Sequence, residues 1–258
     1  MPKLNANLSM MFNEVDFPDR FEAAARAGFK GVEFLFPYAY EKALLEDKLK
    51  SNGLEMVLFN MPPGDWDAGD RGMACDPARR AEFQDNVGKA LDYAIALNCK
   101  QLHCMAGLKP RGTGDEPMRD TYIENLRFAG KELAKHGITL LIEAINTRDI
   151  PGFFLNFSAQ AFDIMHYANV PNLAFQYDIY HMQIMEGDLA PTIEKNLSKI
   201  GHMQLADTPG RHEPGTGEIN YPFLFGFIDR IGYTGWVGCE YRPAARTEDG
   251  LGWARQYL

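Results

Sequence analysis

The feature that most constrains the fold of this chain is the regular alternation of short apolar runs with longer helical patterns along 258 residues. Strands that alternate with helices indicate βαβ units and a parallel sheet. The run 138–145 (ITLLIEAI) is the most apolar, as expected of a parallel strand buried on both faces. The eight predicted strands are residues 4–8, 31–36, 54–60, 101–106, 138–145, 173–178, 200–206 and 236–241.

Helical patterns separate these runs, and several have clear start or stop signals. Asp16 precedes a helical segment with Pro18 in its first turn, and Asp76-Pro77 opens a long pattern that reaches about residue 97. Further helices are predicted at 118–135 (before His136-Gly137), at 159–168 (behind Ser158 as cap), at 222–231 and at 248–258. Eight strands and roughly eight helices in strict alternation predict an α/β fold, a single (β/α)₈ or TIM barrel over residues 1–258.

A doubly wound sheet is the alternative architecture, but it normally has a glycine-rich phosphate loop after its first strand. Here that strand is followed by Asn7-Leu8-Ser9-Met10. The later glycines Gly210, Gly215 and Gly217 indicate a bent loop and not a phosphate cradle, because no helix-opening G-x-G-x-x-G motif follows a strand there. The barrel is therefore favoured, and no nucleotide cofactor is expected.

Composition excludes several classes of partner. A formal net charge of −9 argues against binding to nucleic acids or anionic membranes, since both depend on lysine and arginine. No apolar run approaches the roughly 18 residues of a membrane helix, and the N-terminus lacks the apolar core of a signal peptide. Four cysteines without a C-x-x-C pair indicate free thiols. A cytoplasmic protein with a small-molecule substrate is expected, with a homo-oligomer as a further option.

Polar residues stand at or near the ends of all eight apolar runs, where a barrel places its active site. Those on strands five, six and eight are carboxylates, and strand seven contributes an amide oxygen. Because an unpaired buried carboxylate is costly, these acids call for a compensating cation. Oxygen donors from neighbouring strands suit Mg²⁺ or Mn²⁺. The polar residues in chain order are Asn7, Glu33, Asn60, His103, Glu143, Asp178, Gln204 and Glu240.

At these residues the chain resembles the hydroxypyruvate isomerase group of the xylose-isomerase-like TIM barrels, a group that includes 2-oxotetronate isomerases. The resemblance covers essentially the whole chain and rests on long, unusual strings. These strings are ANLSMMF, AGFKGVEFLFPY, PPGDWDAGDRG, LIEAIN, QYDIYHMQ, HMQLADTPGRHEPGTGEINY and GWVGCEYRP.

The resemblance implies a metal site and a reaction. Its metal ligands would be Glu143, Asp178, Gln204 and Glu240, with Gln204 in place of the histidine found in many sugar epimerases of the superfamily. Glu143 and Glu240 would be the catalytic pair that moves a proton through a metal-stabilised enediolate. The implied reaction converts hydroxypyruvate to tartronate semialdehyde, or 2-oxotetronate to its 3-oxo isomer.

Five further residues are expected to bind substrate, each with a plainer alternative. His181 resembles a substrate-contacting histidine of the sugar epimerases but could be a packing histidine, and Arg211 is expected to hold a carboxylate. Asn7 lies at the same mouth. Glu33 could contact substrate or support residues that do, and His103 is more often a satisfied core histidine.

Two loop features complete the expected mouth. Phe36, Pro37, Tyr38 and Trp66 are expected to form an apolar wall over it. The loop 61–75 is long for a connection between a strand and a helix, which predicts a lid or, alternatively, an oligomer contact.

Other functions of this fold remain as alternatives. An abasic-site endonuclease would assemble three zinc ions from many histidines, and six histidines with a net charge of −9 argue against it. A sugar epimerase and a barrel that binds without catalysis are further options. A proton-transfer route and a hydride-shift route are not separable from the sequence.

Overall fold

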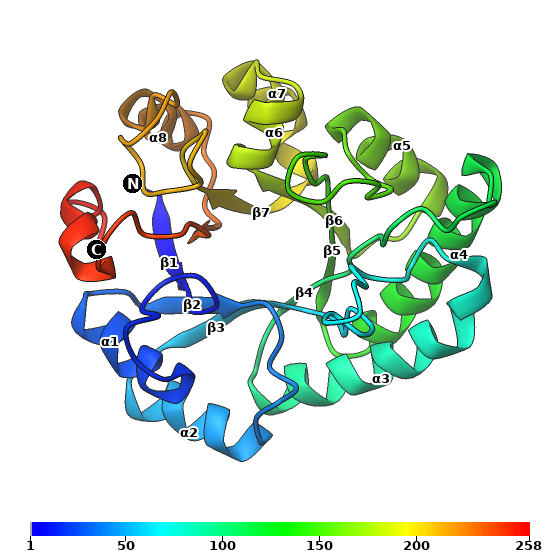
Figure 1. Ribbon diagram of the computed structural model, residues 1–258, viewed down its shortest axis with the longest axis horizontal. Coiled ribbons are helices and arrows are strands. Elements are labelled where there is room, and N and C mark those ends of the chain that lie inside the picture. Colours follow the sequence, from blue (N-terminus) through cyan, green and yellow to red (C-terminus); the bar gives the residue numbers. More distant parts are fainter. Residues whose placement is uncertain (1) are drawn as a thin grey trace.

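The computed structural model describes residues 2–258 and is a closed barrel of eight parallel strands in the order β1 to β8 (Figure 1). The barrel closes between β1 and β8, where Lys3 pairs with Trp236 and Ala6 with Cys239. The predicted TIM barrel is therefore confirmed. Its strands are β1 Lys3–Asn7, β2 Gly31–Phe34, β3 Glu55–Asn60, β4 Gln101–His103, β5 Thr139–Glu143, β6 Leu173–Asp178, β7 Ile200–Leu205 and β8 Trp236–Cys239.

Helices surround the strands on the outside of the barrel (Figure 1). Three of them, α2, α6 and α7, have no counterpart among the helices predicted with bounds from the sequence. Short 3₁₀ segments precede α1 and α3 at Phe17–Asp19 and Pro77–Arg79. The helices are α1 Arg20–Arg26, α2 Lys42–Ser51, α3 Arg80–Ala96, α4 Asp115–Ala134, α5 Ser158–Ala168, α6 Ile179–Met185, α7 Leu189–Asn196 and α8 Tyr221–Arg230.

Two expectations about the helices were wrong, and a third was right only in position. The segment 248–258 is a 3₁₀ helix at Thr247–Trp253 followed by turns, and its two glycines, Gly250 and Gly252, disfavour a regular α-helix. Ser158 is the first residue of α5 and not its cap, since its hydroxyl and its backbone N–H both donate to Glu186. Asp16 does occupy the N-cap position of the 3₁₀ helix Phe17–Asp19, with Pro18 in its first turn as predicted, but its side chain accepts no capping hydrogen bond.

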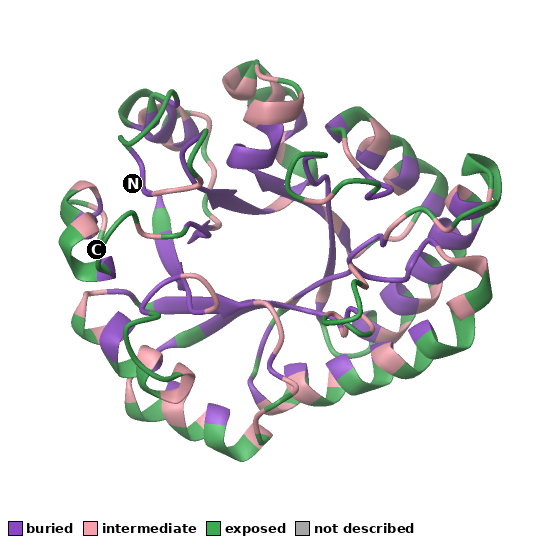
Figure 2. Cartoon of the chain, viewed as in Figure 1, coloured by how far each residue is buried: buried purple, intermediate pink, exposed green. Residues whose placement is uncertain are grey.

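The interior of the barrel divides into an apolar layer and a polar layer. At the amino ends of the strands, Val57 and Leu141 pack with Trp236. Towards the carboxyl ends, the buried side chains become polar, although the strands remain as buried as any part of the chain (Figure 2). This interior departs from the bulky aliphatic filling usual in TIM barrels.

Two global features complete the fold. All four cysteines are buried and free, as the sequence predicts. Among residues 2–258, no helix combines the length and the apolar character that crossing a bilayer requires.

Candidate functional site

The carboxyl ends of the strands meet around one cavity of about 620 Å³. Strand register brings the predicted residues together: Asn7 pairs with Glu33, and Asp178 pairs with Gln204. The cavity is lined by Glu143 and Glu240 from opposite sides, as well as by residues of the loops that follow β3, β5, β6, β7 and β8. The walls are mainly polar, which suits a small, hydrophilic ligand.

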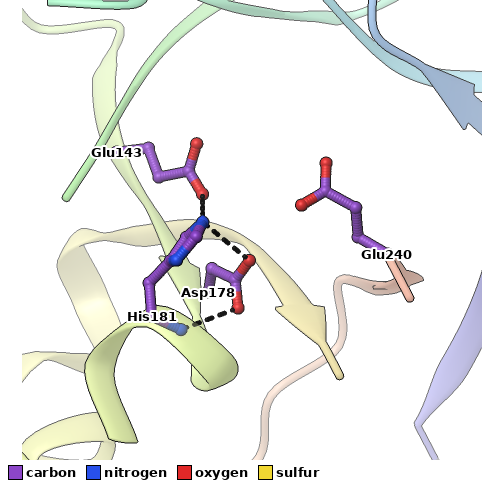
Figure 3. A group of neighbouring side chains, drawn as sticks. All are labelled: Glu143, Asp178, His181 and Glu240. Atoms are coloured by element: carbon purple, nitrogen blue, oxygen red, sulfur yellow. Dashed lines mark hydrogen bonds and ion pairs between the residues drawn. The ribbon is translucent and has the colours of Figure 1, made fainter. Parts of the chain in front are cut away.

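Four side chains at this mouth form a cluster that could hold a metal ion (Figure 3). Candidate ligand atoms of Glu143, Asp178, His181 and Glu240 all lie within 4.8 Å of one another. Glu143 Oε1 and Asp178 Oδ2 are buried and have no hydrogen-bond partner among the described residues. Unpaired carboxylate oxygens that converge in a buried site are the donor set expected around a hard divalent cation, so these residues fit a metal.

Asp178 is positioned by its place at a helix N-terminus. It ends β6 and caps α6, and its Oδ1 accepts hydrogen bonds from the backbone N–H groups of Tyr180 (2.7 Å) and His181 (3.3 Å). The cap uses one oxygen and leaves Oδ2 facing the cluster. The strand-to-helix turn therefore fixes the orientation of this carboxylate.

The hydrogen bonds around His181 determine which ring nitrogen carries the proton. Asn146 Oδ1 accepts from the backbone N–H groups of Arg148 and Asp149, so its Nδ2 is the donor that faces His181 Nδ1 at 2.6 Å. Burial, followed by the charge of Arg211, lowers the pKa of His181 well below its ordinary value, so the ring is neutral. Nε2 then carries the proton and lies 3.6 Å from Asp178 Oδ2. In this tautomer His181 Nε2 is a hydrogen-bond donor in the cavity, and it would have to lose this proton to act as a metal ligand.

Beneath the cluster, Glu33 is the centre of a buried hydrogen-bond network. Its two oxygens accept from Asn5 Nδ2 (2.8 Å), Asn7 Nδ2 (3.0 Å), His202 Nε2 (2.8 Å) and Gln204 Nε2 (2.8 Å). Burial alone would raise the pKa of Glu33, but His202 and the other donors outweigh it, so the pKa is lowered. Glu33 does not line the cavity. Its placement favours a supporting role over direct contact with substrate.

Gln204 belongs to this network, and on β7 it pairs in register with Asp178 of the candidate metal cluster. Its Nε2 is directed to Glu33, which leaves Oε1 as the atom that accepts from Gln176 Nε2 at 2.6 Å. An amide oxygen has two lone pairs, so this contact leaves one acceptor site on Oε1. That Gln204 is a ligand stays a prediction, and the network fixes which of its two amide atoms is available for the role.

Asn7 links the two acidic groups of the mouth. Its Nδ2 donates to Glu33 and, at 3.3 Å, to Glu240 Oε1. Its Oδ1 accepts from the backbone N–H of Ser9, which fixes the amide orientation. Gly238 on β8 provides room for this arrangement, because a Cβ atom there would lie 2.3 to 2.5 Å from the carboxylate of Glu33.

Arg211 lies in the cavity as predicted, but both of its terminal nitrogens already contact protein carboxylates, while its buried Nε has no hydrogen-bond partner among the described residues. Nη2 contacts Glu240 Oε2 at 2.5 Å, and Nη1 contacts Asp149 Oδ2 at 3.0 Å. Burial would lower the pKa of Arg211, yet Glu240, Asp178 and Asp149 outweigh it and raise the pKa. The residue compensates the acids of the mouth.

His103 also lines the cavity. Its Nδ1 lies 3.2 Å from Asn60 Oδ1, and its Nε2 lies 3.6 Å from Glu143 Oε2 without a hydrogen-bond partner. Burial lowers its pKa to about 3, so the ring is neutral. A neutral histidine beside Glu143 can contact a substrate oxygen without adding charge to the site.

The acids of the cluster share an unusual electrostatic environment. Burial, followed by the charges of Glu240 and Asp178, raises the pKa of Glu143 well above its ordinary value. Burial also raises the pKa of Asp178 to about 6 and that of Glu240 to about 8, despite the opposing effect of Arg211. Carboxyl groups that keep a proton near neutral pH are suited to acid and base roles.

The predicted apolar wall is only partly at the mouth. Trp66 lines the cavity, and Phe36 packs against it at a centroid distance of 5.1 Å. Tyr38 instead packs against Tyr93 and donates its hydroxyl to the backbone of Asn60. In the loop 61–75, residues 72–75 are buried.

Sequence reasoning missed several residues that shape the site. Asn146, Gln176 and His202 orient residues that it named, and Arg71 and Arg242 line the cavity. Gln176 and His202 could have been found from strand alternation, since each lies two residues before a predicted site residue. The loop residues have no comparable signal.

Comparison with known proteins supports the same assignment. The chain is 51% identical over 258 residues to 2-oxo-tetronate isomerase of Cupriavidus necator, with 100% of this chain and 99% of that protein covered. It is 52% identical over 257 residues to hydroxypyruvate isomerase of Escherichia coli, with 100% of both chains covered. A solved structure described as AP endonuclease, family 2, from Brucella melitensis superposes with a TM-score of 0.98 at 52% identity, covering 100% of this chain and 99% of that one.

More distant structures share the fold alone. A 3-keto-D-glucoside 4-epimerase from Escherichia coli superposes with a TM-score of 0.83 at 20% identity, covering 99% of this chain and 100% of that one. The sequence profile described as xylose isomerase-like TIM barrel matches residues 21–257. With its closed eight-stranded barrel and full-length relatives that are named isomerases, the chain belongs to the xylose isomerase-like TIM barrel family.

Proposed function

We propose that this protein is a metal-dependent isomerase that converts hydroxypyruvate to 2-hydroxy-3-oxopropanoate (tartronate semialdehyde). The observation that carries the proposal is the pair Glu143 and Glu240, which approach one cavity from β5 and from the end of β8 (Figure 3). Two relatives at about half identity have names of this class, which supports the assignment.

The two glutamates have different surroundings, which suits a division of roles. Glu240 accepts hydrogen bonds from Arg211 and Asn7, and both favour its carboxylate form. Glu143 Oε1 has no donor, and Glu143 faces the charges of Glu240 and Asp178, which favour its protonated form. Like-charged acids in one site tend to hold one proton between them. We therefore propose that one of the two glutamates removes a proton from the substrate and that the other delivers a proton to it.

The reaction needs only proton movements. A carboxylate removes a proton from C3 of hydroxypyruvate, the C2–C3 double bond forms, and the C2 carbonyl oxygen gains a proton. Delivery of a proton to C2 and loss of the C3 hydroxyl proton then give the C3 aldehyde. His181 Nε2–H is the donor we assign to the substrate oxygen as negative charge develops on it. No redox cofactor is required, because the electrons move within the substrate.

We propose Mg²⁺ or Mn²⁺ as the ion, held by Glu143, Asp178, Gln204 and Glu240. Oxygen-only ligands suit these cations better than thiol-seeking metals. The bound ion would supply charge stabilisation to the substrate oxygens.

Metal binding should depend on pH in a definite direction. The pKa values of Asp178 and Glu240 are raised from 3.8 and 4.5 to about 6 and about 8, so their protonation stabilises the metal-free protein. That contribution is complete below the unfolded-state values and is lost as pH rises through about 6 and then about 8. A divalent cation displaces these protons. We expect Mn²⁺ to raise the melting temperature more at pH 8.5 than at pH 6.

Calorimetric titration of Mn²⁺ in buffers of different ionisation enthalpy checks this directly, because it counts the protons released. We expect release at pH 6 and a smaller number at pH 8.5. Binding that releases no proton at pH 6, or that stabilises the protein equally at both pH values, would contradict the raised pKa values.

The substrate is tested by incubating metal-loaded protein with hydroxypyruvate and separately with 2-oxotetronate in deuterated water. We expect metal-dependent turnover followed by NMR, with solvent deuterium at the new C–H position. Turnover without deuterium in single-turnover conditions would argue for a hydride shift. No turnover of either acid by metal-loaded protein would refute the proposed function.

2-Oxotetronate is the second candidate substrate, because relatives at 51% and 46% identity are named 2-oxo-tetronate isomerase. An assay on abasic-site DNA serves as the contrast, given the description of the Brucella melitensis structure. A net charge of −9 makes a poor surface for a phosphate backbone, so we expect no cleavage.

A further inference from the structure

We infer that Arg71, in the loop that follows β3, binds the carboxylate of the substrate and gives the enzyme its preference for acids over neutral ketoses. The inference rests on the proposed function, in which the substrate is a small hydroxy-keto acid. Such a substrate differs from a neutral ketose of the same length by one negative group. The cavity therefore needs a cation that the protein's own acids have not already neutralised.

Three arginines line the cavity, and they differ in what they contact. Arg211 is paired with Glu240 and Asp149, so its charge is shared among protein carboxylates. Arg71 has no carboxylate within 4 Å among the described residues. Arg242 is exposed at the rim. Arg71 is thus the half-buried cation of the cavity that forms no close ion pair among the described residues, although its charge still acts on the carboxylate of the adjacent Asp70.

The guanidinium of Arg71 is also held in place. Nη1 donates to the backbone carbonyls of Trp66 (3.0 Å) and Asp70 (2.6 Å), and Cζ lies 3.9 Å from the centre of the Trp66 ring. Nε and Nη2 have no hydrogen-bond partner in the part of the chain described here. A guanidinium that is anchored and stacked loses little entropy when two donors meet a carboxylate.

The loop that carries Arg71 is itself fixed to the barrel. Gly72 pairs with Ala106, and its N–H donates to the backbone of Pro63. Gly72 has a φ of +97°, and a Cβ atom there would lie 2.6 Å from Met105, so glycine is required for this close approach. Arg71 therefore sits beside a rigid anchor, which suits a specificity residue better than a mobile loop tip does.

The test compares hydroxypyruvate with dihydroxyacetone, which has CH₂OH in place of the carboxylate. In Arg71→Met the side chain can still cover Trp66, but the charge and donors are lost. We expect kcat/KM for hydroxypyruvate to fall by roughly 10- to 150-fold, mainly through KM, as expected for a charged hydrogen bond. The value for dihydroxyacetone should stay within about threefold. Arg71→Lys keeps the positive charge but loses the planar pair of guanidinium donors, so its kcat/KM for hydroxypyruvate should lie between those of wild type and Arg71→Met.

Two arginine variants are the matched controls. Arg111→Met removes an exposed charge outside the cavity and should change neither substrate's kinetics. Arg242→Met tests the competing cation at the rim. Loss of acid preference in Arg242→Met but not in Arg71→Met would overturn the inference, as would an equal fall for both substrates in Arg71→Met.

Binding separates this inference from the proposed function. Glycerate has the carboxylate and hydroxyls but no carbonyl, so its affinity can be measured by calorimetry on metal-loaded protein without turnover. Weaker glycerate binding in Arg71→Met, with unchanged Mn²⁺ affinity and melting temperature, supports the inference even if no isomerisation is found. Equal glycerate affinity in wild type and Arg71→Met overturns it, whatever the activity.

Discussion

Replacing Glu143 or Glu240 with glutamine is expected to lower kcat/KM for keto-acid isomerisation by about 10²- to 10⁴-fold. Glutamine preserves the size of each side chain but cannot accept or deliver the transferred proton. Because both residues also belong to the metal cluster, kinetics should be measured with saturating Mn²⁺ and with metal affinity determined for each variant. A loss that persists at saturating metal is the loss of acid–base function.

The control is Glu194→Gln, which changes an exposed glutamate in α7 that does not line the cavity. It should leave kcat/KM within about twofold of wild type. If the pair acts as a unit, the double variant should be little slower than the slower single variant. Full activity in Glu143→Gln or in Glu240→Gln, at any metal concentration, would refute the two-glutamate mechanism.

Removal of the charge at Glu33 is expected to produce the largest loss of stability of any single change at the site. In Glu33→Gln an amide replaces a carboxylate that accepts from four buried donors, so at least one donor is left facing an NH₂ group. Breaking a buried charged network in this way costs about 3–5 kcal/mol in free energy of unfolding. Urea unfolding monitored by circular dichroism measures the difference.

Two further variants test whether the loss of the Glu33 network causes the expected fall in the free energy of unfolding. Glu213→Gln also removes a buried glutamate, but its carboxylate accepts from the backbone N–H of Ala244, so a loss of only about 1 kcal/mol is expected. Gly238→Ala leaves Glu33 in place but forces its carboxylate aside, so it should also lower the free energy of unfolding. A Glu33→Gln protein as stable as Glu213→Gln would contradict the importance of this network.

The sequence was sufficient to place the strand ends that carry the candidate site residues, because strand patterning and the barrel rule act together. Asp178 ends β6 as predicted, Glu143 ends β5 two residues before the predicted end of that strand, and Gln204 and Glu240 lie within one residue of the ends of β7 and β8. Buried parallel strands leave a strong apolar signal, so their carboxyl ends can be read directly. The closed strand order, β1 to β8, then determines which strand ends lie beside one another at the mouth of the barrel.

Side-chain networks could not be predicted in the same way. Arg211 was expected to be free for a carboxylate, and the structure pairs it with Glu240 and Asp149. That pairing depends on a loop with φ of +55° at Arg211, a conformation uncommon outside glycine and not signalled by the residue type. The tautomer of His181 likewise depends on Asn146, 35 residues away. Such contacts are set by tertiary packing of loops, which periodicity does not encode.

The polar layer inside the barrel has a consequence for engineering. The residues that a stability-driven redesign would replace first with valine or isoleucine include Asn5, Gln176 and His202, since all are buried polar groups between apolar neighbours. These substitutions would remove the hydrogen bonds that orient Gln204 and Glu33, and they would leave the buried Glu33 carboxylate with fewer donors, so a lower melting temperature is expected. Thermostable variants of this enzyme are therefore better sought on the outer helices than in the barrel interior.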